Sequence, residues 1–176
     1  MRGTLNVIPW LLPGLLLSMV VGVAVSGRIA RALHTARPVA WGLVAGFGLV
    51  VFATLTPLRD GLELGAGSIG TCDVSRIGLA PLQDLLRIGD TSLNVLLFIP
   101  LGLAIGLVPG SRRRKAVLLL AVLSPVAIET LQMVLPVLGR GCQTADVFDN
   151  LTGLAIGGVI GAGARILGIG SGAEPA

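Results

Sequence analysis

The stretch SPVAIETLQMVLPVLGRGCQTADVFDNLTGLAIGGVIG, residues 124–161, decides how this chain folds. It consists of two apolar segments joined by a short polar connection. An acid, Glu129, lies inside the first apolar segment, and an amide, Gln132, follows three residues later. The connection and the start of the second segment then contribute Arg140, Asp146, Asp149 and Asn150. A glutamate inside a bilayer is costly, so it marks a candidate functional site.

The composition of the whole chain sets its broad class. Hydrophobic residues make up 53% of the 176 residues and charged residues only 12%, and the mean hydropathy is +0.91. Soluble domains have about a quarter of their residues charged. The sequence therefore predicts an integral membrane protein, and its length fits one compact bundle. The net charge of +4 reflects two basic clusters between apolar runs, which favours membrane topology over nucleic-acid binding as its cause.

Five apolar runs are long enough, or nearly so, to cross a hydrocarbon core of about 30 Å. They are residues 7–25, 39–57, 93–108, 116–138 and 147–167. No run alternates polar with apolar residues as a barrel strand must. The prediction is an all-α, polytopic membrane bundle of about five transmembrane helices.

The first run has two interpretations. Residues 24–26, Ala-Val-Ser, resemble the cleavage site of a signal peptide. However, Arg28, Arg31 and Arg37 follow at once, and positive charge at that place resists translocation. We favour an uncleaved helix.

The basic clusters also predict orientation. Residues 27–38 contain three arginines and residues 111–115 end in RRRK, whereas the other two connections are mixed or acidic. The positive-inside rule then places the N-terminus outside and the C-terminus in the cytoplasm of a multi-pass protein of the cell membrane. In that orientation the polar residues of four helices converge on the outer leaflet. We divide the chain into a first helix with its basic loop (1–38), a membrane domain (39–168) and a flexible tail (169–176).

Two local patterns add detail. Glycines recur at four-residue spacing in three runs, which lets helix backbones approach closely; they are Gly42 and Gly46, Gly102 and Gly106, and Gly153, Gly157 and Gly161. In the first outer connection, Pro81 precedes Leu82, Leu85 and Leu86 on one helical face. We expect a short amphipathic helix there, at the outer interface, as a roof over the polar cluster.

Cys72 and Cys142 are the two cysteines, and the predicted topology places both outside. An even pair on an oxidising face favours a disulfide over two free thiols. The single histidine, His34, lies on the inner side, so the sequence offers no His/Cys zinc site. We assign no metal and no cofactor to the chain.

The motifs resemble those of the VanZ-like family of bacterial membrane proteins. The resemblance lies in Asn94, the FIPLG sequence of residues 98–102, Ser124, Glu129, Gln132, Arg140, Asp146, Asn150 and Gly153. It extends from Pro57 through most of the rest of the chain. The family takes its name from a protein linked to low-level resistance to teicoplanin, a lipidated glycopeptide that binds cell-wall precursors.

The resemblance implies a role in glycopeptide sensitivity, and the residues indicate how. Asn94, Glu129, Gln132, Arg140, Asp146, Asp149 and Asn150 form the predicted polar site. An arginine fork suits phosphate or carboxylate, and the acids suit a cation or that arginine. We expect the site to bind membrane lipids, or a lipidated antibiotic or cell-wall precursor lipid.

Three alternative interpretations of the polar cluster stay open. The first is a structural or partner-binding network, the second a metal-dependent enzyme site acting on a lipid phosphate, and the third part of a proton pathway. The sequence disfavours catalysis, because it contains no nucleophile elbow and no base beside either thiol. It disfavours transport, because no polar path continues into the inner half and no inverted repeat is visible.

Overall fold

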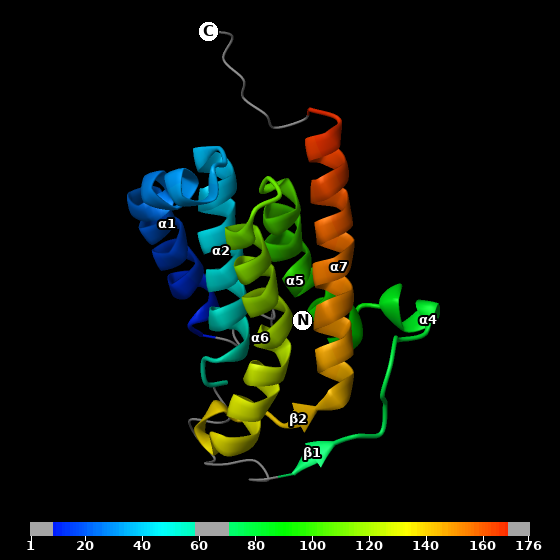
Figure 1. Ribbon diagram of the computed structural model, residues 1–176. Helices are drawn as coiled ribbons and strands as arrows, with labels where there is room; N and C mark the ends of the chain where they lie inside the picture. The colour runs from blue at the N-terminus through cyan, green and yellow to red at the C-terminus, as the bar shows by residue number, and fades with distance from the viewer. Residues whose placement is uncertain (1–8, 59–70, 169–176) are drawn as a thin grey trace, which may run out of the picture.

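The computed structural model describes residues 9–58 and 71–168 as a bundle of helices (Figure 1). Within these residues, five helices are long and apolar enough to cross a membrane. They are α1 (Leu11–Leu33), α2 (Arg37–Thr54), α5 (Asp90–Leu107), α6 (Arg112–Val134) and α7 (Thr144–Ile166). The predicted all-α membrane bundle is confirmed. The expected tail, 169–176, lies outside the described residues.

Four short elements complete the described chain. Two strands of two residues each, β1 (Cys72–Asp73) and β2 (Cys142–Gln143), pair in parallel. A four-residue helix, α4 (Leu82–Leu85), stands beside the bundle, and a 3₁₀ turn, η2 (Pro136–Leu138), follows α6. Pro136 begins this turn because it cannot continue an α-helix, and Gly139 ends it with a φ of 65°.

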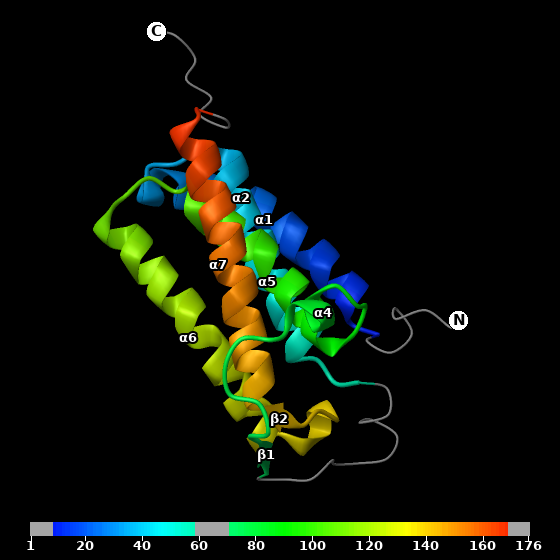
Figure 2. The ribbon, with the colours of Figure 1, turned by 90° about the vertical axis from the view of Figure 1, so that its right-hand side faces the viewer.

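The helices alternate in direction, so the connections gather at two ends (Figures 1 and 2). We call the end that contains β1, β2 and the Cys72–Cys142 bond the disulfide end. The opposite end, which we call the basic end, contains the α1–α2 and α5–α6 connections and the last turn of α7. The two basic clusters of the sequence thus share one end, and the polar stretch 139–146 lies at the other.

Arginines close helix ends at the basic end. Arg113 donates a hydrogen bond to the carbonyl of Ala32 near the end of α1, and Arg165 donates to the carbonyl of Val108 at 3.2 Å. The last carbonyls of a helix lack partners within the helix, and a cation also opposes the negative end of the helix dipole. Arginines at this end therefore also supply hydrogen bonds to carbonyls at the ends of α1 and α5.

The centre of the bundle is the contact between α5 and α7, which is made by glycines. A methyl group added to Gly153 would overlap with the Val95 carbonyl, and one added to Gly157 with the Ile99 carbonyl. On the facing helix, Gly102 has the same relation to the Leu154 carbonyl. The two backbones therefore touch directly, as the glycine spacing predicted.

A second close contact joins α1 to α2, and the sequence analysis did not predict it. The buried face of α1 presents small residues every fourth position, among them Gly14, Ser18 and Gly22. Aromatic side chains of α2 fill the space they leave, Phe52 against Gly14 and Trp41 against Gly22. Serine interrupts the glycine repeat, which is why the pattern was not recognised.

The predicted helix boundaries are partly wrong. The first run was expected to end at residue 25, but α1 continues to Leu33 and includes Arg28 and Arg31. Arginine, alanine and leucine favour helix, and an arginine stem extends along apolar surface, so charge does not end the helix. The fourth run was expected over 116–138, but α6 extends from Arg112 to Val134. Ser111 is its N-cap residue, whose hydroxyl accepts the Arg114 N–H.

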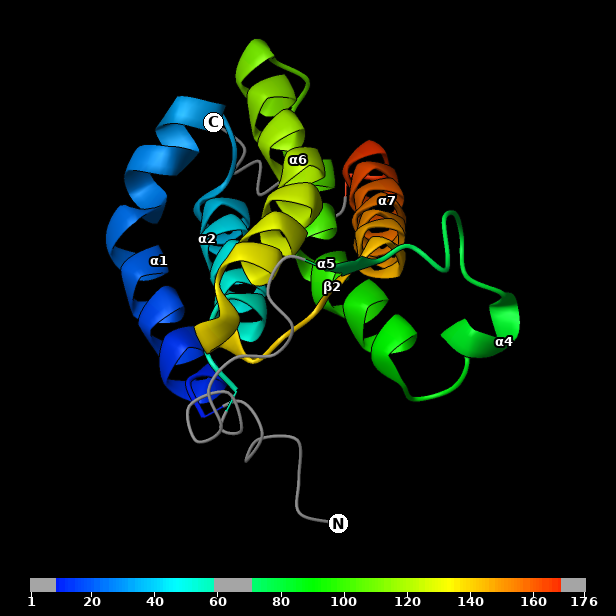
Figure 3. The ribbon, with the colours of Figure 1, turned by 90° about the horizontal axis from the view of Figure 1, so that it is seen from below.

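A short helix forms where it was expected, as α4 after Pro81, but it does not cover the polar cluster. None of the residues of α4 is buried, and Figure 3 shows α4 outside the ring of long helices, beyond α5 and α7. No residue of α4 lines the polar cavity described below. The expected roof over the polar cluster is therefore wrong, because the preceding loop is held against α7 and leads the chain away from it.

Candidate functional site

A cavity of about 630 Å³ lies at the disulfide end, and we call it the polar cavity. Its lining comes from α1, α2, α5, α6, α7 and the 140–143 connection. The polar lining residues are Thr54, Asp90, Asn94, Glu129, Gln132, Arg140, Gln143, Asp146 and Asn150. The apolar ones are Leu11, Ala53, Leu58, Leu93, Leu96, Leu97 and Gly141. Six of the seven residues predicted for the site thus surround one space.

Glu129 connects α6 to the start of α7. The residue is only 5% exposed, and its Oε2 accepts the backbone N–H of Gln143 at 2.7 Å. Gln143 is the N-cap residue of α7, where unpaired N–H groups and the positive end of the helix dipole favour a carboxylate. This contact offsets part of the cost of placing the acid inside the bundle.

Gln132 and Arg140 close the end of α2. The Gln132 amide donates to the Thr54 carbonyl at 3.0 Å, and the Arg140 Nη2 donates to the Ala53 carbonyl at 2.5 Å. These are two of the last carbonyls of α2, which have no partner within the helix. Both residues therefore stabilise the bundle as well as lining the cavity.

Arg140 keeps bonding capacity after this contact. Its Nε is buried without a hydrogen-bond partner. Burial lowers the pKa of Arg140, while the nearby carboxylates of Asp146 and Glu129 act in the opposite direction. An arginine nevertheless stays charged in proteins, so the cavity contains one fixed positive group among three acidic side chains, Glu129, Asp146 and Asp90.

Asp146 and Asn150 lie one turn apart on α7 and share the cavity with Asn94 of α5. The Asn94 amide lies beside the Asp146 carboxyl group. Asn150 is 1% exposed, and its Oδ1 has no hydrogen-bond partner in the described chain. A buried amide oxygen without a partner is costly, so this atom is available to a ligand or to water.

Asp149 does not line the cavity, in contrast to the other predicted residues. Its Oδ2 forms an ion pair with Arg76 Nη2 at 2.5 Å. Arg76 comes from the loop after β1, and its Nη2 also donates to the Ala145 carbonyl. The pair holds this loop against the first turns of α7. Arg76 was not among the predicted site residues. The available signal was its position four residues after Cys72, which a disulfide to Cys142 brings close to the start of α7.

The Cys72–Cys142 disulfide fixes the same loop. The bond joins residues 70 positions apart and brings their Cα atoms to 4.5 Å. Beside it, the Thr144 hydroxyl donates to the Arg76 carbonyl at 2.8 Å. Asp73 Oδ1 accepts the Ser75 N–H at 2.8 Å, and this hydrogen bond lowers the pKa of Asp73. The loop therefore braces the connection that supplies Arg140, Gly141 and Gln143 to the cavity.

Three further polar lining residues, Thr54, Asp90 and Gln143, were not among the predicted site residues. Asp90 is the first residue of α5, where the helix dipole favours an acid. An acid at the start of a predicted helix was the sequence signal that could have identified it. Gln143 contributes its backbone N–H, which no sequence pattern reveals. Within residues 9–58 and 71–168, no group of three or more His, Cys, Asp or Glu side chains is arranged to hold a metal ion.

The lining of the cavity includes apolar side chains that are exposed at the surface of the bundle. Leu93 and Leu96 on its α5 side are 46% and 59% exposed, and both lie on a helix long enough to span a membrane. Buried polar groups thus lie next to apolar side chains at the bundle surface. This arrangement suits an amphiphile better than a small soluble ion.

The fold and the site together define a helical bundle of the multi-pass membrane class, with five helices long and apolar enough to cross a membrane and a polar cavity at one end. The chain belongs to the VanZ/LLP1 family, whose model matches residues 10–165. The match begins before α1 and so includes the first helix, which the motif resemblance did not cover. No curated protein and no solved structure matches the chain.

Proposed function

We propose that the polar cavity binds the headgroup of an envelope lipid or lipidated compound on the outer side of the cell membrane. Through this binding the protein modulates sensitivity to teicoplanin-type glycopeptides. The orientation follows from the positive-inside rule applied to the basic end. The link to glycopeptides follows from the family resemblance.

One observation supports the proposal above the others: the cavity contains buried polar atoms that the protein itself leaves unpaired. Arg140 Nε and Asn150 Oδ1 have no hydrogen-bond partner in the described chain. Buried polar groups are normally satisfied, and exceptions call for an explanation such as a ligand or water. Both residues line the same space.

The charges indicate the kind of headgroup. Arg140 is a donor for phosphate or carboxylate oxygens. The carboxyl groups of Glu129, Asp146 and Asp90 line the same cavity and suit an amine. A zwitterionic headgroup, with an anionic group and an ammonium group, matches both. The apolar lining at Leu93 and Leu96 then meets the start of the lipid chain.

The structural alternative also has specific support. Glu129, Gln132 and Arg140 all bond to backbone atoms at helix ends. If these contacts are their whole role, the cluster locks α2, α6 and α7 together and binds nothing. The two hypotheses differ in whether the charge of Glu129 matters once its hydrogen bond is kept.

The test compares two substitutions at Glu129 in a teicoplanin-sensitive bacterial host that expresses the chain. Glu129→Gln removes the charge but keeps an oxygen that accepts the Gln143 N–H. Glu129→Ala removes both. Asp84→Asn on α4, outside the cavity, is the charge-neutralising control. The measurement is the minimal inhibitory concentration of teicoplanin, with membrane abundance quantified for every variant.

We expect wild type and Asp84→Asn to protect and Glu129→Gln to lose protection at undiminished abundance. Glu129→Ala should lose both protection and abundance. Full protection by an abundant Glu129→Gln protein would leave only the structural role of this residue. No protection by wild type would refute the proposed role in glycopeptide sensitivity.

A further inference from the structure

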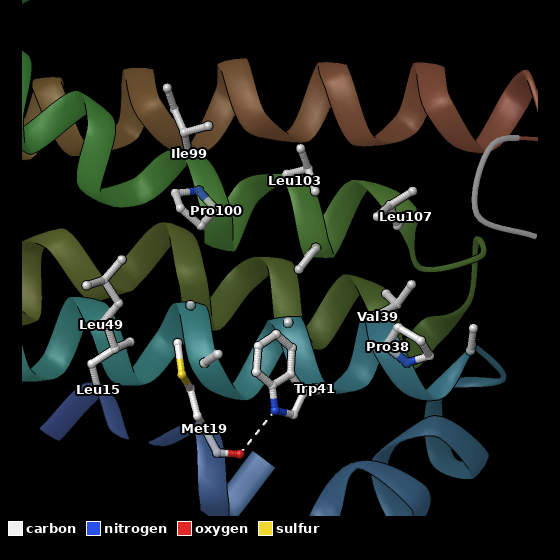
Figure 4. A pocket seen from close by; sticks show the side chains of 15 residues that line it. Leu15, Met19, Pro38, Val39, Trp41, Leu49, Ile99, Pro100, Leu103 and Leu107 are labelled. Atoms are coloured by element: carbon white, nitrogen blue, oxygen red, sulfur yellow. Dashed lines mark hydrogen bonds between the residues drawn. The ribbon is translucent and has the colours of Figure 1, made fainter. Parts of the chain in front are cut away.

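A second cavity, of about 750 Å³, lies between α1, α2 and α5, on the basic-end side of the polar cavity (Figure 4). We call it the apolar groove. Figure 4 shows α2 along its length, with side chains of α5 on one side and of α1 on the other. Leu15, Met19, Trp41, Leu49, Leu103 and Leu107 are among its lining residues.

The chemistry of the groove admits an apolar occupant. Every lining side chain is apolar except Trp41, whose indole N–H donates to the Met19 carbonyl at 3.1 Å. The one polar side-chain group is therefore already paired within the protein. A groove with this lining offers water no hydrogen bonds, whereas a hydrocarbon chain fits it.

The groove continues the polar cavity along the same three helices. On α1 the lining passes from Leu11 in the polar cavity to Leu15 in the groove. On α2 it passes from Ala53 to Leu49, and on α5 from Leu96 to Pro100. Each step is four residues, about one helical turn. One seam between α1, α2 and α5 is thus polar at the disulfide end and apolar beyond it.

The length of the groove matches one leaflet. Its lining runs from residue 99 to 107 on α5 and from 38 to 49 on α2, which correspond to about 12 Å and about 17 Å at 1.5 Å per residue. Half of a hydrocarbon core of about 30 Å is roughly 15 Å. An acyl chain that enters from the polar cavity is therefore covered along most of its length.

We infer that the apolar groove holds an acyl chain of the same lipid whose headgroup occupies the polar cavity. This inference rests on the proposed function, because the polar cavity supplies the headgroup site. It adds that the ligand is a membrane lipid recognised along its chain, and that α1 contributes to recognition through Leu15 and Met19.

The test fills the groove without disturbing the helix contacts. A Cβ added at Gly42 meets only the Ala104 Cβ, at 3.7 Å, an ordinary contact, so Gly42→Leu places its side chain beside or into the groove. Gly163→Leu is the matched control, because a Cβ there meets nothing within 4 Å and Gly163 lines neither cavity. Leu49→Trp fills the groove from a second position.

The probe is a phosphatidylethanolamine with a diazirine halfway along one acyl chain, in vesicles of phosphatidylethanolamine and phosphatidylglycerol that contain the full-length protein. Labelled positions are mapped by mass spectrometry after irradiation. In wild type and Gly163→Leu we expect several-fold more label at Leu49 and Leu103 than at the bilayer-facing Leu16 and Val20. In folded Gly42→Leu and Leu49→Trp proteins, label in the groove falls to that background.

The outcomes separate this inference from the proposed function. Groove labelling that equals background in wild type, or that survives both filling substitutions, overturns the acyl site. Teicoplanin protection that still depends on Glu129 in that case leaves the headgroup site intact. Groove labelling that disappears when the groove is filled supports the acyl site, whether or not wild type protects against teicoplanin. A wild-type protein that gives no protection refutes only the role in glycopeptide sensitivity.

Discussion

Arg76 and Asp149 show how one ion pair decides which acids of α7 face the cavity. Asp149 is 1% exposed, whereas the Arg76 side chain is 26% exposed. Loss of the pair therefore costs more free energy at the buried carboxylate than at the partly exposed guanidinium. Because Asp149 is paired with Arg76, the side chains of α7 that line the cavity are those of Asp146 and Asn150.

Breaking this pair from its two sides should give unequal results. Arg76→Ala leaves a buried carboxylate without its partner and should lower the free energy of unfolding by about 3–5 kcal/mol. Asp149→Asn leaves a partly exposed arginine and keeps one acceptor, so we expect a loss of about 1–3 kcal/mol. Thermal unfolding in detergent measures both. The double variant should lose less than the sum of the two, and additive losses would show that the two side chains are not coupled.

At the residue scale, the sequence predicted the cavity better than the partners within it. Glu129 and Gln132 stood out because polar residues are rare in apolar runs, and Arg140 stood out as the cation of the short connection that follows them. The exclusion of Asp149 from the cavity was not predictable, because Arg76 lies 73 residues away and only the folded loop brings it close. The carbonyls that accept hydrogen bonds from Gln132 and Arg140 were equally unpredictable, because every residue has a carbonyl and no sequence pattern marks the one that is used.

The helices themselves are held together by backbone contact rather than by large side chains. Along α5 and α7 the carbonyl oxygens of one helix lie against glycines of the other. In a bilayer this close packing replaces the hydrophobic driving force, which is absent between apolar helices in lipid.

Neighbouring glycines on α7 provide a direct test of this interface. A Cβ at Gly157 would overlap with backbone atoms of α5, whereas a Cβ at Gly158 meets only the Gly102 oxygen, at 3.9 Å. Gly157→Ala should lower the free energy of unfolding by about 1–3 kcal/mol through overpacking. Gly158→Ala should raise it by about 0.5–1 kcal/mol, because alanine is the better helix former. Equal melting temperatures for the two variants in detergent would contradict the described contact.

Hydropathy predicted the existence of all five helices but not their ends. The bilayer requires about 20 apolar residues for a crossing helix, and that requirement is visible in the sequence. Helix continuation beyond the apolar run is decided by local propensity and capping, as in α1 beyond residue 25 and at Ser111 before α6. The path of the loop that precedes α4 depends on the disulfide and on Arg76, which are contacts between distant segments.

In the described part of the chain, the basic clusters and the polar cavity lie at opposite ends. The α1–α2 and α5–α6 connections share the basic end (Figures 1 and 2), where Arg165 bonds to the Val108 carbonyl. The strands that carry the Cys72–Cys142 bond lie at the other end, next to the 140–143 connection that contributes to the lining of the polar cavity. This separation agrees with the alternation of the five helices, and the positive-inside rule predicts from it that the basic end faces the cytoplasm.

A labelling experiment in intact cells should establish that orientation. In a Cys142→Ser protein, a membrane-impermeant maleimide should label Cys72 from outside. In a protein with Cys72→Ser, Cys142→Ser and Gly110→Cys, the same reagent should label only after the membrane is permeabilised. Gly110 suits this purpose because it lies in the α5–α6 connection and a Cβ there meets nothing within 4 Å. Labelling of Gly110→Cys in intact cells would reverse the proposed orientation.

The bond between Cys72 and Cys142 also sets an order of events during biosynthesis. Cys72 precedes α5, while Cys142 comes after α6, so the partners are translated with two membrane helices between them. The bond therefore forms only after both helices have inserted and both loops have reached an oxidising compartment. Until then the newly made chain has its helices but lacks the brace on the segment that supplies Arg140. We therefore expect completion of the polar cavity to depend on the oxidation machinery of the host, which matters when a strain is chosen to produce the protein.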